Sequence, residues 1–213
     1  MTVELLSHFG GDENHCNVAR VSYAKKAADY TQEQNDRLIN FLVKHKHTSP
    51  FRHSTLQFRI KCPIYVERQL FKHQVGVSVN SISGRYVDFS DSYYEIEQFR
   101  TQSKDSKQGS GDDLSKEDNG IALMIQEDVI MVCKLAYEHL INLGVSKEQA
   151  RSVLPLSLET EFIWTGTFLA FIHMLNLRLK SDTQKETRGI VIEMLKQAQE
   201  LNVFKQSLNA FGY

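Results

Sequence analysis

A polar run from Lys72 to Tyr86 holds the residues with the clearest capacity for chemistry in this sequence. Two cations, Lys72 and Arg85, bracket the run, and serines, an asparagine and glycines lie between them. Side chains of this kind, grouped in one segment, can bind an anionic ligand with hydrogen-bonding edges, such as a nucleotide phosphate. On the local pattern alone, an irregular surface loop with a few charges is an equally good interpretation.

Two arginines elsewhere in the chain lie in contexts that favour a role in binding. Arg178 ends an apolar segment that is expected to form a buried helix, where a guanidinium must pair, bind an anion or reach solvent. Arg151 follows a short capped turn and precedes Pro155. Each arginine also has a structural interpretation, as a helix-end side chain that reaches solvent or, for Arg151, as a surface pair with Glu148.

Three histidines, His45, His47 and His53, raise the alternative of a metal site. The His-x-His spacing suits a metal ion, but no HExxH motif and no nearby carboxylate accompany it. The missing ligands favour histidines that end a helix and line a loop. The serines near His73 lie outside any G-x-S-x-G motif, so hydrogen bonding is favoured over nucleophilic catalysis for them.

Composition and charge limit the classes of function. The chain has 213 residues, of which 41% are hydrophobic, so it suits one domain with a real core. A net charge of -1 and a pI of about 6.7 argue against a general binder of nucleic acid or of membrane surfaces. From Arg52 to Arg85, however, cations outnumber the single acid, Glu67, which favours a small anionic ligand.

The cysteines and the apolar runs bear on the location of the protein. Cys16, Cys62 and Cys133 are widely spaced and form neither a disulfide framework nor a CxxC pair, which is typical of the reducing cytoplasm. The sequence has no apolar run long enough for a transmembrane helix, and its start lacks the pattern of a signal peptide. We expect a cytoplasmic protein.

The elements that position these residues are expected to alternate irregularly between helix and strand. Thr31 and Gln34 form a capping box, and Leu56, Phe58 and Ile60 alternate with polar residues as in a half-buried strand. No GxGxxG or GxxxxGK[ST] motif is present, so Rossmann and P-loop folds are poor fits. A polar segment, 101–119, is expected to be a mobile insertion. The expected helices are 31–46, a short helix from 63, 121–143, 146–151, 167–179 and 182–201, and the expected strands are 54–62, 158–164 and part of 86–97.

Five segments, taken in order, resemble the flavin-dependent thymidylate synthases. They are SPFRH from Ser49, ERQLFKHQ from Glu67, NSISGRY from Asn80, ARSVLP from Ala150 and NLR from Asn176. The second and third segments are similar to the family signature RHRxxSxNxxSxR. The resemblance extends from about residue 19 to residue 188, and the order of the five segments is more specific than any one of them.

The resemblance implies a single α+β domain over residues 1–213, with a central, mostly antiparallel sheet flanked by helices. It implies a homotetramer that binds FAD at its subunit interfaces and reductively methylates dUMP to dTMP, with methylenetetrahydrofolate as carbon donor and NADPH as reductant. It implies no metal ion. By its place in the motif, Arg178 is similar to the arginine that stabilises the uracil ring ionised at N3, which raises the electron density at C5.

The resemblance also assigns binding residues. Arg85 and Arg151 are expected to bind the phosphate of dUMP. The residues implied for dUMP are Gln69, Lys72, Ser81, Ile82, Ser83, Gly84, Arg85, Arg151 and Arg178. Those implied for FAD are Ser49, Lys72, His73, Gln74, Ser81, Thr167 and His173.

The chain departs from the family pattern at several of these positions, as in a divergent branch. Lys72 and Gln74 replace arginines. Between His73 and Ser78 this chain has one residue more than the family signature has. Lysine keeps the charge but loses the bidentate fork of arginine. The other departures are Ser81 for a glutamate, and Thr167 and His173 for asparagines. A phage origin would place the enzyme in the cytoplasm of the host.

Three rival functions are weighed against this one. A metal-dependent nucleotide hydrolase would use His45, His47 and His53. A non-catalytic nucleotide-binding regulatory protein would have lost its flavin contacts. The cysteine-dependent thymidylate synthases are excluded, because they need a nucleophile in a Pro-Cys-His context and Cys62 instead precedes Pro63.

Overall fold

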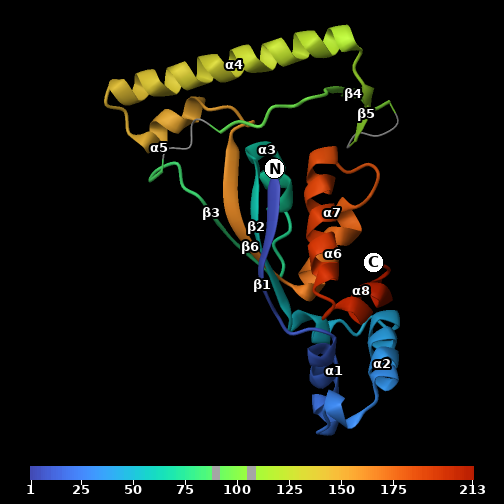
Figure 1. The fold of residues 1–213 in the computed structure, drawn as a ribbon. Coiled ribbons are helices and arrows are strands. Elements are labelled where there is room, and N and C mark those ends of the chain that lie inside the picture. The colour runs from blue at the N-terminus through green and yellow to red at the C-terminus, as the bar shows by residue number, and fades with distance from the viewer. Residues whose placement is uncertain (88–91, 105–108) are drawn as a thin grey trace.

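The computed structural model describes residues 1–87, 92–104 and 109–213 of a chain built around a four-stranded antiparallel sheet (Figure 1). The strands of this sheet are, in spatial order, β1 (Thr2–Phe9), β2 (Thr55–Pro63), β6 (Glu159–Thr167) and β3 (Val77–Ser81). A second sheet has two strands, β4 (Arg100–Gln102) and β5 (Ser110–Asp113). The α+β fold with a central antiparallel sheet is therefore confirmed.

Side-chain alternation decides which face of the sheet is buried. In β2, Leu56, Phe58 and Ile60 are buried, as their spacing predicts. Phe58 is paired in register with Trp164 of β6, and the centroids of their rings lie 6.1 Å apart. The opposite face is polar, which leaves one face of the sheet for the core.

Helices cover the apolar face and one end of the sheet (Figure 1). The face is covered by α6 (Phe168–Arg178) and α7 (Lys185–Glu200), and α3 (Ile64–Leu70) packs against β2, β6 and α7. The remaining helices before α4 and after α7 are α1 (Asp12–Arg20), η1 (Val21–Tyr23), η2 (Ala27–Asp29), α2 (Gln32–Lys44), η3 (Ser49–Arg52) and α8 (Lys205–Phe211). Of these, α1, α2 and α8 contact one another beyond the end of the sheet.

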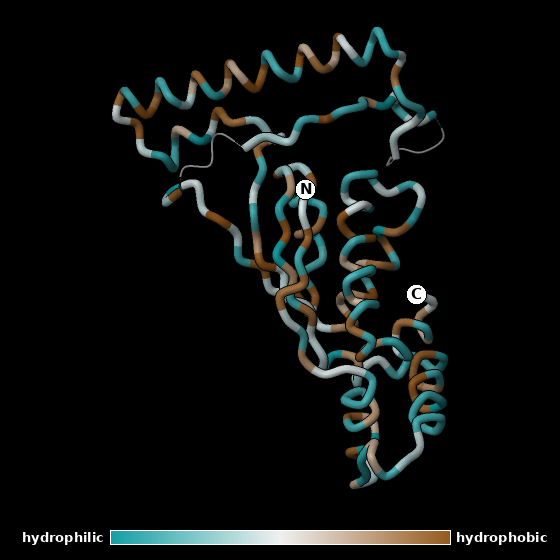
Figure 2. Tube along the Cα trace, viewed as in Figure 1, coloured by the Kyte–Doolittle hydropathy of each residue, from teal (hydrophilic) through white to brown (hydrophobic). Residues whose placement is uncertain are grey.

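The longest helix, α4 (Lys116–Asn142), stands apart from the central sheet (Figure 1). Within the chain it packs on α5 (Lys147–Ala150) and η4 (Arg151–Val153), and only Asn119 and Tyr137 of its residues are buried. Apolar positions recur along it (Figure 2), and the exposed ones are Ile121, Met124, Ile125, Val129, Met131, Val132 and Leu135. Among the described helices, none is both long and apolar enough to cross a membrane.

The long periodic segments were predicted correctly. The capping box is confirmed at α2, where Gln34 N donates to Thr31 Oγ1 (3.3 Å) and Thr31 N donates to Gln34 Oε1 (2.9 Å). The strands expected at 54–62 and 158–164 are β2 and β6, and α4, α6 and α7 correspond to expected helices. No sequence pattern predicted β1, α1 or α8. It also missed β3, a strand within the polar run that pairs with β6.

Two segments, 86–97 and 101–119, are only partly described by the structure. The described part of 86–97 holds one isolated bridge, Tyr93 to Leu158, instead of a strand, and 88–91 lie outside the described residues. The segment 101–119 contains most of β4, all of β5 and the start of α4, and 105–108 lie outside the described residues. The mobility of this insertion stays a prediction.

Candidate active site

A pocket of about 550 Å³ opens between the end of α3, the end of α6 and the loop that leads into α7. Its walls carry more cations than acids, which favours an anionic ligand. The lining residues are Arg68, Gln69, Lys72, Leu177, Arg178, Lys180, Asp182, Thr183 and Gln184. The structure thus brings together three residues that the sequence assigns to dUMP, namely Gln69, Lys72 and Arg178.

Two hydrogen bonds fix the guanidinium of Arg178, which lies in the last turn of α6 as predicted. Its Nε donates to Nε2 of His73 (2.9 Å), and its Nη2 donates to the backbone oxygen of Gln69 (3.1 Å). Arginine has five N–H donors, so these bonds occupy only part of the group. Nη1 bonds to no residue in the described part of the chain and is left for a ligand.

His73 can accept the bond from Arg178 only in its neutral form. Burial lowers the pKa of His73 below the ordinary 6.5, and the charges of Arg178 and His173 lower it further. With the Nε2 lone pair committed to Arg178, the ring proton belongs on Nδ1. The neutral state of His73 therefore keeps the arginine in place.

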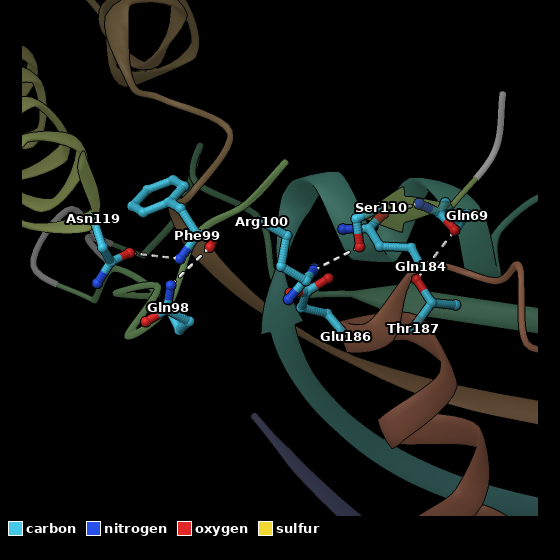
Figure 3. Close-up of polar contacts among 9 residues, drawn as sticks. All are labelled: Gln69, Gln98, Phe99, Arg100, Ser110, Asn119, Gln184, Glu186 and Thr187. Carbon is cyan, nitrogen blue, oxygen red and sulfur yellow. Dashed lines mark hydrogen bonds and ion pairs between the residues drawn. The ribbon is translucent and has the colours of Figure 1, made fainter. Parts of the chain in front are cut away.

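The side-chain amide of Gln69 is held at both ends by residues close to the start of α7 (Figure 3). Thr187 Oγ1 donates to Gln69 Oε1 (3.1 Å), and Gln69 Nε2 donates to Gln184 Oε1. Thr187 is fully buried, and Gln184 lines the pocket. Sequence reasoning missed both residues. The one signal was that Thr187 falls on the buried face of a predicted helix, in step with Ile190.

A partly buried ion pair ties the two-stranded sheet to α7 (Figure 3). Arg100 Nη2 lies 2.7 Å from Glu186 Oε1, and Arg100 Nε donates to Ser110 Oγ (2.7 Å). Burial opposes ionisation of Glu186, but the hydrogen bond and charge of Arg100, together with the polar groups of its own backbone and of Gln184, outweigh burial and hold the pKa below the ordinary 4.5, while Oε2 bonds to no described residue. Glu186 is therefore a charged carboxylate next to Gln184.

The polar run passes close to the start of α6. Thr167 caps this helix by accepting from Ala170 N (3.1 Å), and its own backbone N donates to Gly76 O (2.8 Å). A Cβ at Gly76 would lie 2.8 Å from Thr167 Oγ1, and φ at Gly76 is +73°. Only glycine suits that approach and that dihedral angle.

Some of the residues that the resemblance assigns to FAD lie on or next to this helix, and others lie in the polar run. His173 is an exposed residue on an otherwise buried stretch of α6, and its charge acts on His73. Ser49 is exposed and begins η3, which packs on α6. Lys72 and Gln74 are exposed in the turn between α3 and β3. These exposed donors and acceptors, on α6, on η3 and in the turn before β3, suit a large polar cofactor.

The other end of the polar run leads away from the pocket. Ser81 ends β3, and its Oγ donates to Glu67 Oε1 (3.2 Å). Burial raises the pKa of Glu67, although Ser81 and Arg68 oppose that rise. Beyond it, Ile82 N donates to Glu161 O (2.8 Å), Ser83 Oγ accepts from Arg85 N (3.4 Å), and Gly84 is buried.

Two predicted phosphate-binding arginines are not part of the pocket lined by Arg178. Arg85 is exposed, and its guanidinium carbon lies 5.2 Å from the ring centroid of Tyr86. Arg151 is exposed, and its Nε donates to the backbone oxygen of Glu148 (3.3 Å). One chain therefore divides the implied dUMP residues between two places.

The residues of the rival functions are arranged differently from what those functions need. Within the described residues, no group of three or more His, Cys, Asp or Glu side chains, including His45, His47 and His53, is placed to hold a metal ion. Burial raises the pKa of the Cys16 thiol to about 11 and that of Cys62 to about 12, so neither is an activated nucleophile.

Comparisons with known proteins agree with the fold and show the family. The Thy1 family model, described as thymidylate synthase complementing protein, matches residues 4–202. A flavin-dependent thymidylate synthase of Kosmotoga olearia is 40% identical over 198 residues, covering 91% of this chain and 83% of the relative. One from Thermus thermophilus is 41% identical over 186 residues, covering 87% of this chain and 67% of the relative.

A solved structure is similar over almost the whole chain. PolB, a UMP/dUMP methylase from Streptomyces cacaoi bound with 5-Br dUMP, superposes with a TM-score of 0.84 at 26% sequence identity. The superposition covers 99% of this chain and 94% of PolB. The fold and the site thus define an α+β enzyme of the nucleotide-methylase type. The chain belongs to the Thy1 family of flavin-dependent thymidylate synthases, which confirms the resemblance found in its five segments.

Proposed function

We propose that this enzyme converts dUMP to dTMP by a reductive methylation that depends on FAD. The observation that carries the proposal is Arg178, whose guanidinium is fixed by His73 and Gln69 at the wall of a cationic pocket. PolB, which binds 5-Br dUMP, shares the fold across nearly the whole chain, and this supports a pyrimidine nucleotide as the substrate.

Arg178 acts on the pyrimidine by charge. A uracil ring whose N3 lies against the free edge of the guanidinium loses its proton more readily, because the developing negative charge is stabilised in place. Electron density then rises at C5, the carbon that receives the methyl group. The arginine needs no reorganisation at that moment, since His73 and Gln69 already fix it.

FAD suits the residues around α6. Lysine and a helix start complement phosphate charge, and amide, imidazole and hydroxyl groups match the polar edges of a flavin. The residues that would hold FAD are Ser49, Lys72, His73, Gln74, Ser81, Thr167 and His173. When bound, the flavin supplies the reducing equivalents of the reaction, and the protein supplies orientation and charge.

The division of the dUMP residues supports sites shared between copies of the chain. Arg85 and Arg151 lie outside the pocket of Arg178, so in our proposal they bind the phosphate of a nucleotide whose ring lies in another copy. The exposed apolar positions of α4 provide a surface for that association. We propose a homotetramer in which each site draws residues from more than one protomer.

The co-substrates and the location complete the proposal on the strength of the family resemblance. We propose methylenetetrahydrofolate as carbon donor, NADPH as reductant and the cytoplasm as the site of action. Without a cysteine nucleophile, methylation would proceed with no covalent bond between enzyme and nucleotide.

The test combines the visible spectrum of the purified protein with an assay of dTMP formation. We expect a yellow protein with flavin absorbance that forms dTMP from dUMP, folate and NADPH. Arg178→Ala should lower the rate by at least about 100-fold, the scale of losing one preorganised charge, while flavin absorbance is kept. Arg37→Ala, a control at an exposed arginine that pairs with Glu33 on α2, should retain the rate.

Other outcomes would identify the rivals. A colourless protein that binds dUMP but no added FAD would indicate a nucleotide-binding regulatory protein. Substantial turnover by Arg178→Ala would remove Arg178 from the proposed role.

A further inference from the structure

The direction of the amide of Gln69 is set by neighbours that have no assigned role. Glu186 accepts from Arg100 at Oε1, whereas its Oε2 is buried with no partner among the described residues, and the NH₂ end of the nearby Gln184 amide, when it faces this carboxylate, favours the charged form. Gln184 then presents Oε1 to Gln69, and the NH₂ group of Gln69 donates a hydrogen bond to it. The hydroxyl of Thr187 completes the chain by donating to Gln69 Oε1 (3.1 Å).

The consequence concerns what Gln69 can offer to a ligand. Its oxygen already accepts from Thr187, and one N–H is committed to Gln184. The second N–H is the group left for the pocket, which Gln69 lines together with Arg178. Without Thr187 and Gln184 the amide could turn over and present an acceptor, because its two ends are similar in shape.

We propose that Thr187 and Gln184 are positioning residues that lock Gln69 as a hydrogen-bond donor to an acceptor oxygen of the nucleotide. The acceptor is either a phosphoryl oxygen or the carbonyl at C4 of the pyrimidine. This inference rests on the proposed function and deepens it, since it assigns the recognition of the nucleotide to a chain of residues that runs from Thr187 to Glu186.

The experiment measures the dissociation constant of dUMP by calorimetry on the flavin-loaded enzyme. Thr187→Val keeps the shape of the side chain and removes the hydroxyl, and it should weaken dUMP binding about tenfold, the scale of one buried hydrogen bond. Thr187→Ser keeps the hydroxyl and should restore most of the affinity. Thr160→Val, at a buried threonine of β6 outside the pocket, is the matched control and should bind as wild type does.

Two further comparisons separate positioning from packing. In a Gln69→Leu background, Thr187→Val should cause no additional loss, because both changes act through one amide. With deoxyuridine in place of dUMP, the loss of affinity caused by Thr187→Val disappears if the acceptor is the phosphate. With dCMP, it disappears if the acceptor is the C4 carbonyl, which cytosine replaces by an amine.

The contrary results are equally specific. Any one of four results would overturn the inference. Thr187→Val could bind dUMP as tightly as wild type, or Thr187→Ser could lose as much affinity as Thr187→Val. The losses of affinity from Thr187→Val and Gln69→Leu could be additive, or Thr187→Val could cause the same loss for dUMP, deoxyuridine and dCMP. A wild-type enzyme that forms dTMP while its Thr187 variants show one of these results contradicts the inference alone. A wild-type protein that binds no dUMP contradicts the proposed function and this inference together.

Discussion

At the scale of single residues, the proton on His73 decides how Arg178 is held. A neutral imidazole accepts from Arg178 Nε, whereas an imidazolium cannot accept and repels the guanidinium. Because burial, Arg178 and His173 lower the pKa of His73 below 6.5, the neutral form persists into mildly acidic solution. The arrangement of Arg178 that we propose as the active one is therefore present at neutral pH and is lost on acidification.

This leads to a prediction about pH. We expect the rate of dTMP formation to fall as the pH drops through a value below 6.5, the ordinary pKa of histidine. The measurement is a pH profile of kcat. His73→Gln retains an acceptor without a titrating proton, so its profile should lose this acidic inflection.

Acid unfolding has to be separated from that effect. Burial lowers the pKa of His15 from 6.5 to about 3. Between these two pH values His15 is therefore protonated in the unfolded chain and neutral in the folded chain. The stability that neutral His15 contributes is complete above pH 6.5 and decreases as the pH falls towards 3. Circular dichroism at each pH restricts the kinetic comparison to folded enzyme. An acidic inflection that persists in folded His73→Gln would contradict the role of His73.

The sequence predicts some site residues and not others for a physical reason. Arg178, Gln69 and Lys72 lie in motifs, and the structure brings them to one pocket. Thr187 and Gln184 lie in no motif. Their bonds to Gln69 join segments 115 or more residues apart, and such a contact exists only once the chain is folded.

At the scale of elements, the close approach of β6 to its own tryptophan sets a steric limit. A Cβ at Gly166 would lie 2.3 Å from Cη2 of Trp164, whose ring is fully buried. Gly166 is paired in register with Leu56 of β2 and Val77 of β3. Glycine at this position is what lets the three strands and the ring share the space.

We therefore predict that Gly166→Ala lowers the free energy of unfolding by about 1–3 kcal/mol through overpacking. Gly189→Ala is the matched control, since its new Cβ would meet nothing within 4 Å on α7. There the change should stabilise the helix by about 0.5–1 kcal/mol. Urea denaturation of wild type and both variants measures the two changes in the free energy of unfolding. A Gly166→Ala protein as stable as wild type would show that Trp164 can shift.

Predictability from sequence follows the strength of the local pattern. In β2 and α6 many apolar residues repeat at one period, so both were predicted correctly. In β1 the register shifts between Leu5 and Ser7, which breaks the alternation. The five residues of β3 are too few and too polar to stand out, and pairing with β6 makes them a strand.

At the scale of the whole molecule, α4 is the element that a single chain leaves incomplete. Its exposed apolar side chains recur at three- and four-residue intervals, a pattern that usually marks a buried stripe. Ile125 is 59% exposed and Val129 is 49% exposed. Association of copies through this helix would cover the stripe.

We predict that Val129→Glu shifts the protein to a smaller species in analytical ultracentrifugation and lowers dTMP formation at least tenfold, because in our proposal each site is shared between copies that associate through α4. Glu138→Gln, at an exposed polar position of the same helix, should keep both the size and the rate. A Val129→Glu protein of unchanged size would show that α4 is not the surface through which copies associate.

The order of strands in the sheet also decides when each strand can find its pairing partner during synthesis. β1 can pair with β2 as soon as residue 63 is available, but β3 has no partner until β6 is made. About 100 residues separate the ends of β2 and β6, which at ordinary elongation rates amounts to roughly 5 to 20 s. For that interval the inner edge of β2 lacks hydrogen-bond partners, and so does β3 once residue 81 is made, which leaves both free to pair with other chains.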